Sequence, residues 1–371
     1  MIKNKIARCF LLLSALLNTS IICAQVKKLR PLKDKMMVGE LVPVQKKEKW
    51  GYAFADDPKQ KLVIKNVFEE AHPFVDSVAI IKDEGKYGLL HRDGTLRLLL
   101  EFDEMQDFKD GLSFARKGNI HVNIKTDGSE LSRWTENEDG SILFELSPLH
   151  AFKMVMVRNG MFNMGTKVEI EEMDYDSPIH EVRITKDYHI GETEVTQGVW
   201  NKVIGANPSI SKDNNKPVEN ITFEDCQTFI AKLGDWFPKF TFRLPTEAEW
   251  EFAATNRGNS TSKYAGSNDN TLVAWTAETS NNESHAVKTK QPNALGIYDM
   301  SGNVAEWCSD WYNSSYYKVC PLNDPEGASF AKGRVVRGGS WGHVYPFSRT
   351  TNRDSHDPKY KSGSLGMRLA L

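Results

Sequence analysis

The sequence has few cysteines, no excess of basic charge and no long uninterrupted apolar run. Five cysteines occur in 371 residues, and none has the Cys-x-x-Cys or Cys/His spacing of a structural zinc site. Lys and Arg number 47 against 49 Asp and Glu, so nucleic acid is not an expected partner. With 40% hydrophobic and 26% charged residues, the chain has enough apolar material to fold, and its length suggests two domains.

The first 24 residues have the order of a secretory leader. Basic residues precede the apolar run Phe10–Leu17, and small residues follow at the expected distance. A membrane anchor is the alternative, but Asn18–Ser20 interrupts the apolar segment, and a span needs ~20 apolar residues. We therefore predict cleavage after Ala24, no transmembrane span in the mature chain and a periplasmic or secreted location.

The cysteines bear on the same question. Cys23 is an alternative acceptor for lipid, which would make the chain an outer-membrane lipoprotein, although bulky Ile22 precedes it. Cleavage would leave Cys226, Cys308 and Cys320 in an oxidising compartment, where an odd number leaves one thiol unpaired. We interpret these three as disulfide-bonded or buried thiols.

Residues 45–130 repeat themselves with a period in the thirties. The segment Lys49-Trp-Gly-Tyr52 is similar to Lys86-Tyr-Gly-Leu89, and the expected turn at Asp93-Gly94 recurs at Asp127-Gly128. Such a period predicts stacked units, here short β-hairpins. The pattern resembles the WG-repeat family, which implies a docking or spacer element; a small solubilising β-domain is the alternative. The polar residues 131–150, including Glu136–Gly140, are interpreted as a linker.

Residues 151–371 form the predicted second domain. Helix starts are expected at Thr196, Thr222 and Thr246, the last with the Thr-x-x-Glu pattern of a capping box ending at Glu249. Beyond Ala254 the chain is rich in Gly, Asn, Asp and Ser, which predicts long irregular loops.

Several short blocks in this domain occur in a fixed order. They are Gly160–Gly165, Ser177–Val182, Glu192–Gln197, Asn207-Pro208, Pro217–Asn220, Phe242–Phe252, Asn293–Asn303, Glu306-Trp307, Arg334–Trp341 and Ser364–Arg368. Together they resemble the sulfatase-modifying-factor family, whose type member is the formylglycine-generating enzyme. The resemblance implies an α+β, irregular C-type-lectin-like fold with a calcium-supported loop core.

The enzymes of that family oxidise a sulfatase cysteine to formylglycine with copper held by two cysteines. Soft thiolates suit Cu(I), but the matching positions here are His343 and Ser348, and a tryptophan beside the oxygen pocket is Ala305. Ser340 is retained, yet one hydroxyl cannot hold copper. We therefore expect no copper and assign no catalytic residue.

The resemblance also implies a calcium site on the loop from Asp299 to Glu306. Asp299 and Glu306 would contribute side-chain oxygens, and Gly302 and Val304 would contribute carbonyl oxygens, which are the ligands that calcium prefers. A turn held by its own hydrogen bonds is the alternative. A second family calcium site, near Trp275, is poorly matched, so one site is expected.

A ligand cleft is the remaining candidate site. Aromatic and arginine side chains suit a peptide or glycan, and those at the family's cleft position are Trp341, His343, Tyr345, Phe347, Arg349 and Arg353. They are core residues in the alternative reading. Arg243, Glu247 and Glu249 are interpreted as a local salt-bridge network rather than a groove.

The sequence thus favours an exported non-catalytic binding or scaffold protein, whose partner is a protein, peptide or glycan of the cell envelope. One alternative is an oxygen-dependent oxidoreductase of the same fold that acts on a protein or small thiol. Another is a structural component of the cell envelope or a gliding apparatus.

Overall fold

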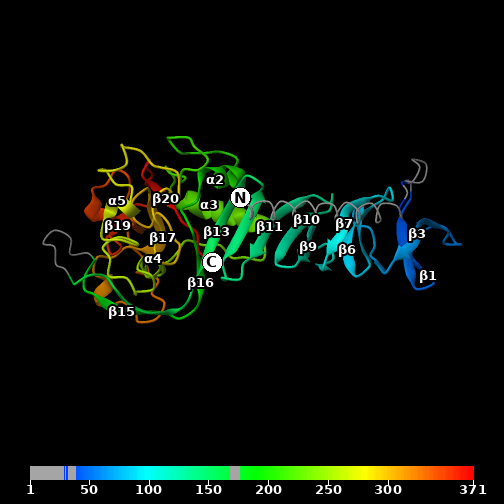
Figure 1. The fold of residues 1–371 in the computed structure, drawn as a ribbon, viewed down its shortest axis with the longest axis horizontal. Helices are drawn as coiled ribbons and strands as arrows, with labels where there is room; N and C mark the ends of the chain where they lie inside the picture. The colour runs from blue at the N-terminus through cyan, green and yellow to red at the C-terminus, as the bar shows by residue number, and fades with distance from the viewer. Residues whose placement is uncertain (1–28, 30, 32–38, 168–175) are drawn as a thin grey trace, which may run out of the picture. The chain divides into compact units, whose positions relative to one another are not determined.

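The computed structural model describes residues 29, 31, 39–167 and 176–371, and its elements are labelled in Figure 1. Contacts divide the chain into two compact units, Met1–Arg133 and Trp134–Leu371. The predicted leader, with Cys23 and the cleavage position, lies outside the described residues. Among the described helices, none is both long enough and apolar enough to cross a membrane.

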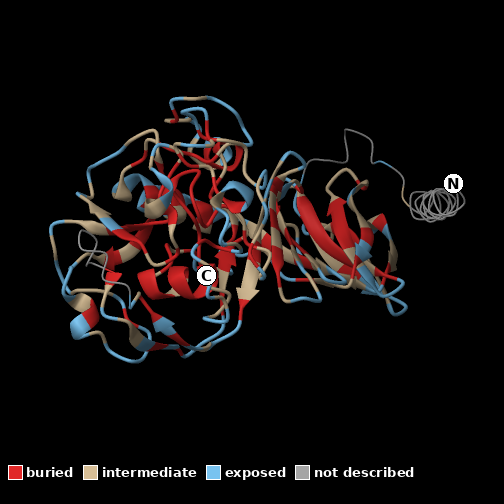
Figure 2. Ribbon diagram, turned by 60° about the vertical axis from the view of Figure 1, so that its left-hand side comes forward, coloured by how far each residue is buried: buried red, intermediate tan, exposed pale blue. Residues whose placement is uncertain are grey.

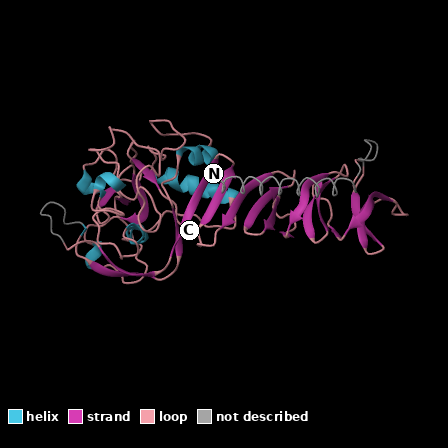
Figure 3. Ribbon diagram, viewed as in Figure 1, coloured by secondary structure: helices cyan, strands magenta, loops and turns pink. Residues whose placement is uncertain are grey.

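The first unit is built from antiparallel strands, drawn in magenta in Figure 3. Its sheets have the orders β1-β2-β3 and β4-β5-β6-β7, and β9 pairs with both β8 and β10. The strands are β1 (Leu41–Lys46), β2 (Lys49–Phe54), β3 (Leu62–Phe68), β4 (Glu70–Ala71), β5 (Val78–Asp83), β6 (Lys86–His91), β7 (Leu96–Phe102), β8 (Glu104–Met105), β9 (Leu112–Lys117) and β10 (Ile120–Lys125).

Close backbone packing explains why each predicted repeat has a glycine in its Trp-Gly or Tyr-Gly motif. Gly51 in β2 and Gly88 in β6 lie at equivalent irregularities in the pairing with the next strand. A Cβ atom would lie 2.5 Å from the Ile64 carbonyl oxygen at Gly51 and 2.8 Å from that of Leu98 at Gly88. Only glycine lets the two backbones approach this closely, so the repeated motif marks a repeated strand irregularity.

The predicted Asp-Gly turns are present, and the structure adds a third. Gly94, Gly128 and Gly140 all have φ near +80°. The backbone N–H of the residue after each glycine donates to the preceding aspartate, as Ser141 does to Asp139 at 2.9 Å.

The third turn overturns the predicted linker at 131–150. It joins β11 (Glu130–Glu136) to β12 (Ile142–Ser147), and Trp134 and Phe144 on these strands are fully buried. The aromatic rings of Phe237 and Phe240 pack edge-on against both. The segment is therefore part of the second unit's core and not a spacer.

The second unit combines short sheets with few helices. Its sheets have the orders β16-β13-β12-β11, β14-β15 and β19-β18-β17-β20. The further strands are β13 (His150–Val157), β14 (Gly160–Met164), β15 (His180–Ile184), β16 (Tyr188–Gly191), β17 (Ala305–Trp311), β18 (Arg334–Arg337), β19 (Arg353–His356) and β20 (Leu365–Met367); the helices are α2 (Gln197–Ile204), α3 (Phe223–Trp236), α4 (Glu247–Ala254) and α5 (Asn270–Val273), with 3-10 turns at Tyr316–Lys318 and Tyr345–Ser348.

The three helix starts predicted from the sequence are confirmed. Thr196, Thr222 and Thr246 are the N-caps of α2, α3 and α4, and each hydroxyl accepts a backbone N–H of the first turn. Thr246 forms a capping box with Glu249, as expected. The Glu249 carboxylate also accepts two hydrogen bonds from Arg243, at 2.6 and 2.7 Å, which confirms a local salt-bridge network.

The core of the second unit buries charge as well as apolar side chains. Val157, Phe162, Trp250 and Phe252 lie in one apolar cluster, which Figure 2 colours red with the other buried residues. The largest fully buried side chains also include three arginines, namely Arg337, Arg353 and Arg368. Burial of these guanidinium groups requires paired carboxylates, because an unpaired buried charge is very costly.

Candidate functional site

The two positions expected to match the copper cysteines, His343 and Ser348, lie close to Ser340 and Gly339. His343 Nδ1 is 3.1 Å from the Ser340 hydroxyl. Ser348 is fully buried, and its Oγ has no hydrogen-bond partner among the described residues. A Cβ at Gly339 would lie 2.7 Å from that Oγ. The site therefore offers an imidazole and two hydroxyl groups, which are harder ligands than thiolates.

The three described cysteines do not replace the missing pair. Cys226 and Cys308 are buried and Cys320 is half-buried, and all three are free thiols. Burial raises the pKa of Cys226 and Cys308 well above its usual range and that of Cys320 to about 11. A copper ligand must be the thiolate, which these environments disfavour.

The structure corrects the arginine part of the predicted cleft. Arg353 is 2% exposed, and its guanidinium binds both carboxylate oxygens of Glu247 at 2.6 and 2.7 Å. Arg349 lies 3.1 Å from the Asp176 carboxylate. Placing Arg353 in an open cleft is wrong, because its charge is already neutralised inside the core.

The aromatic part of that segment is only partly open. Trp341 is half-buried and donates its indole N–H to the Gly363 carbonyl at 2.8 Å. The rings of His343 and Phe347 have centroids 5.8 Å apart. Tyr345 is 50% exposed, so it is the aromatic ring of this segment that is most available to a ligand.

On the predicted calcium loop, Asp299 lies in the left-handed region with a φ of 58° and is buried. Its Oδ2 accepts the backbone N–H of Lys288 at 2.9 Å. Burial raises the pKa of Asp299 to about 6. A buried carboxylate on such a tight turn, followed by Gly302 and Val304, fits a hard cation.

Glu306 has a different environment from the one expected of it. Its Oε1 accepts from Arg368 Nε at 3.1 Å and Nη2 at 2.6 Å. Its Oε2 accepts from Arg368 Nε at 2.9 Å and from the Trp250 indole N–H at 2.7 Å. Each oxygen thus already receives two hydrogen-bond contacts, so Glu306 fits the cation site less well than Asp299 does.

A third carboxylate near this loop was missed by the sequence reasoning. Glu194 is 1% exposed, and neither of its carboxylate oxygens has a hydrogen-bond partner among the described residues. Burial, followed by the nearby charge of Asp299, raises the pKa of Glu194 well above its usual range. The only sequence signal was its place in the block Glu192–Gln197. Across the described chain, no three His, Cys, Asp or Glu side chains are grouped closely enough to hold a metal by themselves, so backbone carbonyls would have to contribute.

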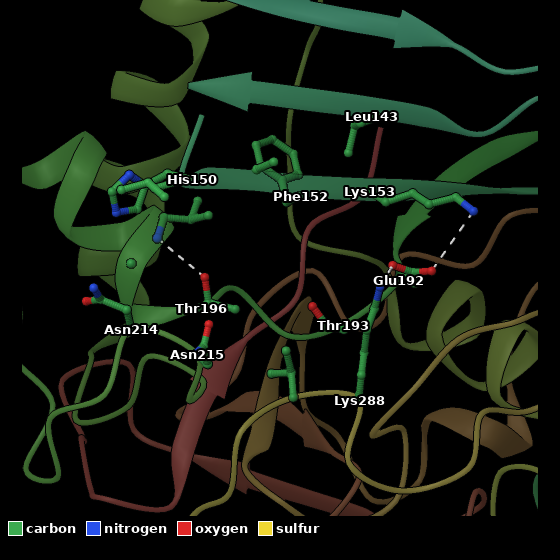
Figure 4. A pocket seen from close by; sticks show the side chains of 15 residues that line it. Leu143, His150, Phe152, Lys153, Glu192, Thr193, Thr196, Asn214, Asn215 and Lys288 are labelled. Atoms are coloured by element: carbon green, nitrogen blue, oxygen red, sulfur yellow. Dashed lines mark hydrogen bonds and ion pairs between the residues drawn. The ribbon is translucent and has the colours of Figure 1, made fainter. Parts of the chain in front are cut away.

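A cavity of about 340 Å³ lies elsewhere in the second unit and was not predicted. It is lined by residues of β13, the start of α2 and the loops around Asn214 and Lys288, as Figure 4 shows. Lys153 and Lys288 both approach the Glu192 carboxylate, the former at 4.0 Å. Phe152 adds an aromatic ring. The volume of this cavity is at the lower end of the range for ligand pockets, and none of the predicted cleft residues lines the cavity.

The chain is similar in sequence to curated proteins and in fold to solved structures. The chain is 35% identical to a formylglycine-generating enzyme of Streptomyces coelicolor over 188 residues, which are 46% of this chain and 57% of that enzyme. It is 30% identical to the chaperone protein LppX of Paenibacillus barcinonensis over 230 residues, 48% of this chain and 77% of that protein. Treponema denticola variable protein 1 superimposes with a TM-score of 0.56 and 29% identity, covering 62% of this chain and 98% of that one.

Family matches account for both units. Residues 54–87 and 87–119 match the WG containing repeat, which confirms the predicted repeats. Residues 143–371 match the sulfatase-modifying factor enzyme 1-like domain, so the match begins before residue 151, the start expected from the sequence. The chain therefore belongs to the family of the sulfatase-modifying factor enzyme 1-like domain.

Proposed function

We propose that the chain is an exported, non-catalytic binding or scaffold protein of the cell envelope. In this proposal its second unit is a calcium-supported, C-type-lectin-like domain that has lost copper chemistry. The mature chain would begin at Gln25 and act in the periplasm or outside the cell, on a protein, peptide or glycan.

One observation carries the proposal, namely the chemistry at the two former thiol positions. The His343 ring is bound to Ser340 at 3.1 Å, and Ser348 presents a buried hydroxyl. These groups do not provide the soft dithiolate pair that holds Cu(I), and Ala305 removes the neighbouring indole. The proposed loss is of metal ligands rather than of fold, since the family match covers residues 143–371.

Two further observations support a binding role. The cavity beside β13 and α2 combines an aromatic ring with amide, ammonium and carboxylate groups, a lining that suits directed recognition of a polar ligand. The Paenibacillus relative is described as a chaperone protein, so a protein of similar sequence is not named as an oxidase.

The test is an assay for formylglycine formation by the mature full-length protein. We expect a Cys-x-Pro-x-Arg peptide, incubated with the protein, copper, a reductant and oxygen, to keep its sulfur by mass spectrometry. The matched variant combines His343→Cys with Ser348→Cys and should bind Cu(I) if the segment occupies the family's copper position. Copper-dependent turnover by the unmodified protein would overturn the proposal.

A further inference from the structure

The buried carboxylate of Glu194 has no role in the functions described so far. This side chain has two acceptor oxygens removed from water and no hydrogen-bond partner among the described residues. Leaving a buried polar group unpaired costs ~1–3 kcal/mol, and more for a charged group. Such a side chain needs either a proton or a positively charged ligand.

The backbone places Glu194 beside the loop that carries Asp299. The Glu192 carbonyl accepts the N–H of Tyr298 at 2.8 Å, and the Val195 N–H donates to the Met367 carbonyl at 2.9 Å. The segment that contains Glu194 is therefore held between the residue that precedes Asp299 and the residue that precedes Arg368.

Arg368 is the common neighbour of these segments. Its guanidinium donates to the Gly191 carbonyl at 2.8 Å and to the Tyr298 carbonyl at 2.9 Å, as well as to Glu306. Arg368 is thus a buried cation next to these segments. Its hydrogen bonds go to Glu306 and to two carbonyl groups rather than to Glu194.

The charges at this place do not balance. When ionised, Glu194, Asp299 and Glu306 carry three negative charges against the single positive charge of Arg368. All four side chains are buried. The Lys288 side chain is 44% exposed and pairs with Glu192, and its charge lowers the pKa of Asp299 less than that of Arg368 does. A divalent cation supplies the two missing positive charges, and hard oxygen ligands suit calcium.

We propose that Glu194 is a direct ligand of the divalent cation held by the Asp299 loop, and that Glu306 is a positioning residue. Glu194 and Asp299 supply carboxylate oxygens, and the carbonyl groups of Gly302 and Val304 supply the others. Glu306 keeps its bonds to Arg368 and Trp250 and fixes the loop. This inference rests on the proposed calcium binding and changes which side chains perform it.

The experiment measures calcium binding to the mature full-length protein by isothermal titration calorimetry after chelator treatment. Glu194→Gln should lower calcium affinity at least about tenfold, since removal even of an outer partner of a metal ligand costs ~10–100-fold. Without calcium its melting temperature should equal or exceed that of the wild type, because a buried charge has been removed. A merely structural carboxylate would lower it.

Glu219→Gln is the matched control. Glu219 is also 1% exposed, and its Oε2 likewise has no hydrogen-bond partner in the described structure, but its other oxygen accepts the N–H of Ile210. This variant should bind calcium like the wild type. If Glu194→Gln does not fold, Glu194→Asp keeps the charge but shortens its reach, and its calcium affinity should fall below the wild-type value.

The outcomes separate the two proposals. Wild-type protein that binds no calcium overturns both of them. Wild-type protein that binds calcium while Glu194→Gln, or Glu194→Asp in its place, binds it equally well overturns the role of Glu194 alone, and leaves Glu194 as a protonated core residue. Weaker binding by the Glu194 variant but not by Glu219→Gln supports the proposal.

Discussion

The Met1–Arg133 unit and the Trp134–Leu371 unit bury different kinds of side chain. The first stacks apolar residues of short hairpins, such as Ile80, Leu89 and Val122. The second buries arginine–carboxylate pairs between residues far apart in the sequence. Arg368 and Glu306 are 62 residues apart, and Arg353 and Glu247 are 106 apart.

This difference predicts how far the effect of a substitution spreads in each unit. A hairpin repeat depends on its own turn and its neighbour, so a defect should stay local. A buried ion pair joins several loops at once, and loss of one partner leaves the other charge uncompensated. We therefore expect single substitutions to have larger and wider effects in the second unit.

The largest expected effect is that of Arg368→Ala. The change leaves Glu306 buried without its cation and frees the carbonyls of Gly191 and Tyr298. We expect a loss of about 3–5 kcal/mol in the free energy of unfolding. Tryptophan fluorescence during denaturant unfolding measures it, because only Trp50 of the nine tryptophans precedes residue 134.

Arg158→Ala is the control for this prediction. Arg158 is largely exposed and pairs with Asp187 at 2.8 Å, and exposed pairs contribute only ~0–1 kcal/mol. Equal losses for Arg158→Ala and Arg368→Ala would contradict the claim that buried pairs hold the second unit together.

A smaller effect, with a pH signature, is expected of Asp310→Asn. Asp310 is buried and accepts the N–H of Glu247 at 2.8 Å. Burial, then the charge of Glu247, raises the pKa of Asp310 from 3.8 to about 7. Between about pH 4 and pH 7 the folded state holds a proton that the unfolded state has released, so this group's stabilisation is lost as the pH rises.

Asparagine stays neutral, so Asp310→Asn should be more stable than the wild type by up to about 4 kcal/mol at pH 8, given ~1.4 kcal/mol per pKa unit. Near pH 4 the difference should vanish. Denaturant unfolding at both pH values measures it. A difference that does not change with pH would show that the Asp310 carboxyl ionises normally.

The smallest effect is expected of Gly88→Ala, a substitution in the first unit. Gly88→Ala places a methyl group 2.8 Å from the Leu98 carbonyl oxygen, and overpacking of this kind costs about 1–3 kcal/mol. Hydrogen exchange should accelerate in β5, β6 and β7 and stay unchanged in α2, α3 and α4. As a control, Gly234→Ala meets open space in α3 and should not destabilise the protein. Faster exchange in the helices of Gly88→Ala would contradict local failure.

The sequence predicts best those features that short segments determine. Thr222 and Thr246 indicate where their helices begin, because a capping side chain acts within the first helical turn. The turns at Asp93-Gly94 and Asp127-Gly128 follow from the same local chemistry. The turn at Asp139-Gly140 has the same chemistry, but the polar residues around it suggest a linker and give no sign that Trp134 and Phe144 are buried.

The site depends on partners that no local pattern reveals. Arg353 looks like a cleft residue until the fold places it against Glu247. Glu194 is one carboxylate among many in the sequence, and only its burial without a hydrogen-bond partner among the described residues singles it out. The expected lack of copper thiols stays a prediction, because it depends only on which residues stand at positions 343 and 348.

We propose that the second unit keeps the family fold and an oxygen-ligand cation site but lacks thiolate copper chemistry. Metal analysis of the mature full-length protein tests it most directly, after dialysis against calcium together with copper and a reductant. We expect one bound calcium per chain and no retained copper. Stoichiometric copper, or a protein that retains neither metal, would contradict it.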